Sequence, residues 1–132
     1  MNESDMLQAA FKINEQINFL WNFYVVFSGI LLGWIFSTSV DWSREKRIIL
    51  ILLFAIFATI NNLALFNEYT LLKLLLADME RTITQKTLET FSFLSRFIDS
   101  TGTGPTGAFI VHGCADSLII LLIWRSTAKT HR

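Results

Sequence analysis

The chain has 132 residues, of which 52% are hydrophobic and only 17% are charged. So high an apolar content excludes a disordered or collagen-like chain, and a single cysteine excludes a disulfide scaffold. Eleven basic and eleven acidic residues give no net charge, whereas a nucleic-acid-binding protein needs a dense basic surface. We therefore expect no nucleic-acid partner. The mean hydropathy of +0.47 instead indicates an integral membrane protein in contact with a lipid bilayer.

The first uncharged run covers residues 16–40 and exceeds the ~20 residues that a helix needs to cross the hydrocarbon core. It predicts a transmembrane helix over residues 17–37. A cleaved signal peptide is the alternative, because Ser37 and Ser39 form a small-residue site. The acidic residues that precede the run, together with its length, favour the transmembrane helix.

Two further apolar runs predict two more transmembrane helices. Residues 48–66 are dominated by Ile, Leu, Phe and Ala, and residues 107–124 carry His112 and Asp116 within a largely apolar sequence. Lipid offers no hydrogen-bond partner to exposed backbone, so each run has to be helical. The expected fold is an all-α integral membrane protein, a single membrane domain with three transmembrane helices.

The distribution of Lys and Arg predicts how the chain is oriented. The short segments 41–47 and 125–132 are dense in basic residues, whereas residues 1–16 and the long connection 67–106 hold few for their length. Short basic segments next to membrane spans stay in the cytoplasm. We therefore expect a cytoplasmic C-terminus, with the N-terminus and the long connection outside.

The long connection is expected to form an external amphipathic helical segment over residues 67–99. It is either continuous with the second span or bent near its threonines. A heptad pattern predicts an oligomeric coiled coil, although Lys86 and Thr90 interrupt it. The alternatives are a helix lying on the headgroups and a helix packed against neighbouring subunits. Apolar residues lie on one side at helical spacing: Leu72, Leu76, Met79, Ile83, Leu94 and Ile98.

A glycine-rich stretch, residues 100–107, ends the connection. Such loops can cradle phosphate, but this one lacks the Gly-Lys-Ser/Thr ending of a P-loop. We interpret it as a turn that leads back into the membrane, with Thr103 as the N-cap and Pro105 in the first turn of the third helix.

Polar residues inside the predicted spans are the candidate functional residues. They fall at similar depths in the outer half of the bilayer when the three spans are placed across it. His112 and Asp116 are four residues apart and share one helix face. A carboxylate near the bilayer centre costs about 2.5–3.5 kcal/mol on insertion scales, so it has to face a partner or water. The predicted pathway or polar cluster comprises Asn18, Asn22, Asn61, Asn62, His112 and Asp116.

Small residues mark the predicted helix-packing positions, which are Gly29, Gly33, Gly113 and Ser117. Three helices do not readily enclose both a pathway and a packed core, so we expect a homo-oligomer. A metal site is not expected, because the His, Cys and Asp of the third span offer at most two ligands on one face. No cofactor is expected, and without a nucleophile and base at catalytic spacing we expect no enzyme.

The leading hypothesis is a small oligomeric, channel-like membrane protein that forms an ion or proton pathway. Alternatively, the chain is a non-conducting accessory or structural subunit that binds a membrane-protein partner through residues 67–99. The polar residues would then hydrogen-bond across helices and fix their register. The layout of three spans, an external N-terminus and a basic C-terminal tail also resembles one class of phage holins, which implies a lysis pore. The external connection is longer here than in those proteins.

Overall fold

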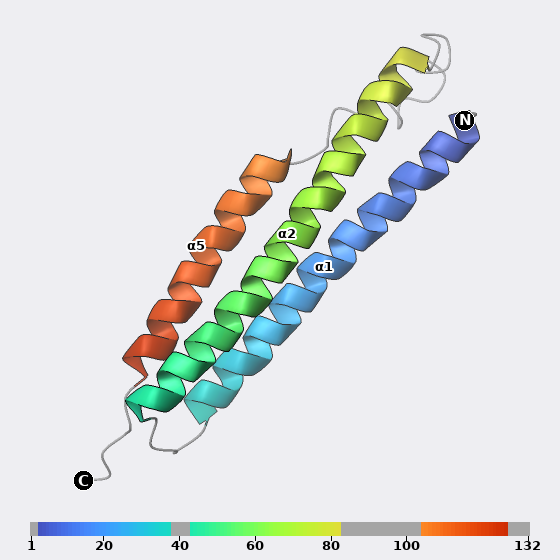
Figure 1. The fold of residues 1–132 in the computed structure, drawn as a ribbon. Helices are drawn as coiled ribbons and strands as arrows, with labels where there is room; N and C mark the ends of the chain where they lie inside the picture. Colours follow the sequence, from blue (N-terminus) through green and yellow to red (C-terminus); the bar gives the residue numbers. More distant parts are fainter. Residues whose placement is uncertain (1–2, 38–42, 83–103, 127–132) are drawn as a thin grey trace.

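The computed structural model describes residues 3–37, 43–82 and 104–126. They form three α-helices: α1 (Glu3–Ser37), α2 (Arg44–Thr82) and α5 (Gly104–Arg125). All three are long and apolar enough to cross a membrane. The expectation of an all-helical protein with three membrane-spanning candidates is thus confirmed. α2 lies between the other two helices and packs along both, whereas the backbones of α1 and α5 approach each other at few points (Figure 1).

The three helices differ in length, and this difference sets the shape of the molecule. α5 has 22 residues and is about 33 Å long, close to the ~30 Å of a hydrocarbon core. α1 and α2 have 35 and 39 residues, or about 53 and 59 Å. They therefore continue past the start of α5 at one end of the bundle (Figure 1). We call this two-helix part, residues 3–16 and 67–82, the extension.

The extension is held by a heptad seam between α1 and α2. The buried residues of α2 are spaced four or three apart, with one interval of seven between Leu65 and Leu72, which is the pattern of left-handed helix pairs. In the extension they pack against α1 of the same chain, where Ala10 and Ile17 are buried. The buried residues of α2 are Phe54, Ala58, Asn61, Leu65, Leu72, Leu76 and Met79.

The described part of the connection follows one of the two alternatives and differs from the sequence expectation in one respect. α2 continues past residue 66 to Thr82 without a break, and residues 83–99 lie outside the described part. The described residues of the apolar stripe, Leu72, Leu76 and Met79, pack against the N-terminal part of α1, and no helix was expected over residues 3–16. These residues are helical because their apolar side chains continue the seam of α1 at seven-residue spacing.

The other half of the bundle has a second apolar core to which all three helices contribute. α1 supplies Leu31 and Ile35, α2 supplies Phe54, and α5 supplies Ile119 and Ile123. The outward faces are apolar too, as the exposure of Ile30, Leu53 and Leu118 illustrates. Apolar side chains on both faces are typical of helices that lie in lipid.

Both ends of α5 are defined by local interactions. It begins at Gly104, whose φ of 62° favours glycine, and Pro105 follows in the first turn, where its missing N–H costs nothing. At the other end the Arg47 guanidinium donates to the carbonyl oxygen of Trp124 over 2.9 Å and lies over its ring. A cation at a helix C-terminus satisfies free carbonyls and the helix dipole.

Candidate functional site: a polar cluster between the three helices

A carboxylate near the middle of α5 joins all three helices. The hydroxyl of Tyr24 in α1 donates a hydrogen bond to Oδ1 of Asp116 over 2.6 Å. Nδ2 of Asn62 in α2 donates to Oδ2 of the same carboxylate over 3.0 Å. Asp116 lies about 18 Å along α5 from Gly104, near the centre of a bilayer that α5 would span. Both carboxylate oxygens are therefore satisfied by groups from other helices.

The energetics of the membrane interior explain why this arrangement is stable. An isolated carboxylate in hydrocarbon is costly, and hydrogen bonds to a charged acceptor are about twice as strong as those between neutral groups. Tyr24 of α1 and Asn62 of α2 provide two such bonds. The backbones of α1 and α5 barely touch, so the bond from Tyr24 to Asp116 is a major link between these two helices.

His112 lies one turn from Asp116, toward the extension, and its side chain is completely buried. Its ring contacts Trp21 and Tyr24 of α1, with both centroid distances 4.2 Å. Neither ring nitrogen of His112 has a hydrogen-bond partner. The indole N–H of Trp21 donates instead to the hydroxyl of Tyr69 over 3.2 Å. The imidazole is thus enclosed by aromatic rings, directly beside the carboxylate.

The four asparagines named from the sequence occupy different environments. Asn62 binds Asp116, and Asn61 is buried on α2 with its Nδ2 unpartnered. Asn18 and Asn22 lie on the exposed side of α1. The structure therefore brings together Asn62, His112 and Asp116, and it leaves two of the six predicted residues on the surface of the bundle.

The small residues predicted to pack helices do not do so within the chain. Gly29 and Gly33 are exposed, and a Cβ atom on either would meet nothing within 4 Å. Gly113 is half-buried with the same open space, and the hydroxyl of the exposed Ser117 donates to the carbonyl of Gly113 in its own helix. These positions remain available for contacts with another copy or partner.

The sequence interpretation overlooked Tyr24 and Trp21, two central members of the cluster. Aromatic residues are frequent at membrane surfaces, so an aromatic residue near one end of a span does not by itself indicate a buried position. The spacing of α1 held the missing signal. Tyr24 follows Ala10 and Ile17 at seven-residue intervals, and all three are buried. If the heptad pattern is extended to the residues before Ile17, it predicts that the hydroxyl of Tyr24 lies inside the bundle.

The chemistry available to the cluster is hydrogen bonding and proton exchange. Within residues 3–37, 43–82 and 104–126 there is no group of three or more His, Cys, Asp or Glu side chains that could hold a metal ion. The acceptor is a carboxylate, the donors are a phenol and an amide, and an imidazole lies beside them. Comparison with protein-family models, with curated proteins and with solved structures finds no match to this chain.

Proposed function

We propose that this chain is a non-conducting membrane subunit. Its polar cluster locks three spans into one unit, and its extension presents the chain to a membrane-protein partner. The observation that carries the proposal is the engagement of Asp116: each of its two oxygens accepts a hydrogen bond from another helix of the same chain. A carboxylate engaged in this way links the helices of its own chain, and each of its oxygens has fewer acceptor sites left for a mobile ion or proton.

The outward faces of the spans support the same proposal. A pore between copies needs a polar helix face to line it. The exposed side chains of the spans are mostly large and apolar, as at Val26, Leu52 and Phe109. The exposed hydroxyls of Thr59 and Ser117 donate to carbonyls four residues earlier in their own helices. They therefore offer little to a hydrated ion.

The extension has the surface expected of a segment in contact with protein and water. Its seam is closed by α1, and its outward side mixes charged residues such as Lys73 and Asp78 with the exposed Leu71 and Leu74. Exposed leucines among charges are typical of the central and rim parts of a binding surface. A partner would therefore meet the outward side of α2, not the buried stripe that the sequence singled out.

Reconstitution in proteoliposomes tests the proposal. The purified full chain is expected to give no proton or cation flux above empty vesicles between pH 5 and 8. Asp116→Asn, which removes the carboxylate charge but keeps the side-chain size, is expected to behave identically in this assay while lowering stability in detergent. Flux through the wild-type chain that Asp116→Asn abolishes would overturn the proposal.

An ion or proton pathway is the second candidate, and one specific observation favours it. Both ring nitrogens of His112 and Nδ2 of Asn61 are buried without partners close to a carboxylate. Buried polar atoms without partners are rare and mark places where water or a proton is accommodated. If the chain forms such a pathway, His112→Phe is expected to abolish the flux of protons or cations in proteoliposomes. The exposed Gly29 and Gly33 would allow a second copy to approach closely, so the homo-oligomer stays a prediction for both candidates.

A further inference from the structure

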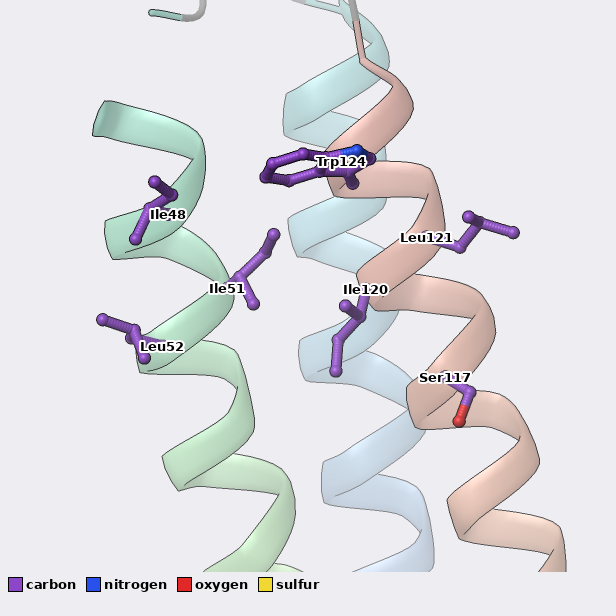
Figure 2. Close-up of a pocket in the computed structure, with 7 residues that line it drawn as sticks. All are labelled: Ile48, Ile51, Leu52, Ser117, Ile120, Leu121 and Trp124. Atoms are coloured by element: carbon purple, nitrogen blue, oxygen red, sulfur yellow. The ribbon is translucent and has the colours of Figure 1, made fainter. Parts of the chain in front are cut away.

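An open apolar groove runs between α2 and α5 at the end of the bundle opposite the extension, with a volume of about 450 Å³. Figure 2 shows Ile51 of α2 and Ile120 of α5 pointing into the space between the two helices. The indole of Trp124 reaches from α5 toward α2 at the outer end. The size is within the range of small-molecule sites. Because the lining is almost wholly apolar, its occupant has to present a hydrocarbon chain.

Each wall of this groove leads into an arginine. On α2, Leu52 and Ile48 line the groove, and Arg44 follows at the same four-residue spacing. On α5, Ser117 and Leu121 line it, and Arg125 continues the series. Residues four apart on a helix lie one above the other. Both arginines are exposed, so two exposed basic side chains flank the mouth of an apolar groove.

The other charged residues at this end of the bundle add to its positive charge. Lys46 is also exposed at this end, and Glu45 is the single acidic residue among residues 43–47 and 124–126. Lys46 and Trp34 line a smaller apolar groove of about 260 Å³ on the other side of α2. Tryptophan and basic residues are the side chains that anchor helices at the headgroup level. This end of the bundle therefore repeats one combination, an apolar groove below a tryptophan and a cation.

We propose that the groove between α2 and α5 is a site for an anionic phospholipid, with an acyl chain along Ile48, Ile51 and Leu121 and the phosphate held between Arg44 and Arg125. Charge complementarity selects this occupant. A zwitterionic lipid fills the groove equally well but gains little binding energy from two arginines. Each basic residue near a membrane surface raises the affinity for an anionic lipid about fivefold. The Arg47 guanidinium is held by the end of α5 and keeps the two walls in register.

Spin-labelled lipids test the site in the full-length chain. The protein is reconstituted in phosphatidylcholine vesicles with trace spin-labelled phosphatidylglycerol or phosphatidylcholine, and the motionally restricted fraction of each label is measured. We expect the wild type to prefer phosphatidylglycerol. Either Arg44→Gln or Arg125→Gln lowers this preference by up to about fivefold, and the double variant abolishes it. The pair Lys73→Gln and Arg81→Gln, with the same charge change in the extension, is expected to leave it unchanged.

A second variant separates the groove from surface charge alone. Ser117→Phe fills the groove without altering any charge, so it is expected to lower the restricted phosphatidylglycerol fraction while both arginines remain. Equal restriction of the two labels by the wild type would overturn the proposal, as would an unchanged preference in the double arginine variant or in Ser117→Phe. A groove occupied by a second copy leaves only boundary lipid restricted, with no preference for phosphatidylglycerol, and also overturns the proposal.

Discussion

The hydroxyl of Tyr24 lies 2.6 Å from Oδ1 of Asp116, although the two residues are 92 positions apart in the chain. This hydrogen bond joins α1 to α5, two helices whose backbones are otherwise nearly separate. The phenol belongs to an apolar heptad seam and the carboxylate to the most costly class of side chain in a membrane. Their pairing explains why neither position is occupied by an ordinary apolar residue.

Tyr24→Phe is expected to lower the free energy of unfolding in detergent micelles by about 1–2 kcal/mol, because it removes one donor from a buried carboxylate and keeps the ring. Unfolding by a denaturing detergent, followed by circular dichroism, measures the change. Tyr69→Phe is the matched control, since its hydroxyl accepts only the neutral indole N–H of Trp21. An equal loss in both variants would show that Tyr24 has no special link to Asp116.

His112→Phe is expected to change the free energy of unfolding by less than about 1 kcal/mol, because the imidazole forms no hydrogen bond and its contacts are with rings. His112→Ala is the contrasting variant and should cost about 3 kcal/mol, since it leaves a cavity at a fully buried site. The same unfolding assay measures both. A large loss in His112→Phe would indicate that the nitrogens have partners such as water.

Arg47→Gln is expected to loosen the last turn of α5, because it removes the cation that donates to the carbonyl of Trp124. The stabilisation of a helix C-terminus by a cation amounts to about 1 kcal/mol, or roughly a fivefold faster amide exchange in that turn. Hydrogen exchange read out by mass spectrometry measures it. Lys46→Gln, one position earlier and exposed, should have no effect, and equal exchange in both variants would argue against the cap.

Leu76→Ala is expected to open the extension, because Leu76 is 6% exposed and packs in the seam against α1. A buried Leu→Ala change costs about 2–5 kcal/mol. Amide exchange across the first part of α1 should accelerate accordingly. Leu74→Ala makes the same truncation at a side chain that is 60% exposed, and is expected to change exchange little. If both variants behave alike, the seam does not hold the two helices together.

The orientation of the chain can be tested by cysteine labelling in a Cys114→Ser background. Because basic segments adjacent to spans remain in the cytoplasm, Thr82→Cys should react with an impermeant maleimide added to intact cells. Ser43→Cys, at the start of the basic segment before α2, should react only after the cells are permeabilised. The reverse pattern would invert the topology while leaving the helix packing unchanged.

The membrane-spanning candidates were predictable because each depends on local composition. Long apolar runs identify helices that can cross lipid, since no other backbone conformation is satisfied there. The helix over residues 3–16 was not predicted, because its stability comes from packing on α2 and not from its own hydropathy. The only sign of this long-range packing in the sequence is a weak heptad pattern of apolar residues.

The three helices able to cross a membrane, and the position of Asp116 within the last of them, follow from the order of apolar and polar residues along the chain. The groups that meet this carboxylate are set by the packing of the helices. Helix packing places Asn62 and Tyr24 in hydrogen-bond contact with Asp116 and leaves Asn18 and Asn22 on the exposed side of α1. The hydropathy of the sequence predicts the depth of a residue in the membrane. It does not predict the rotation of a helix about its own axis, because the face that a helix turns toward its neighbours is set by side-chain packing along the whole seam.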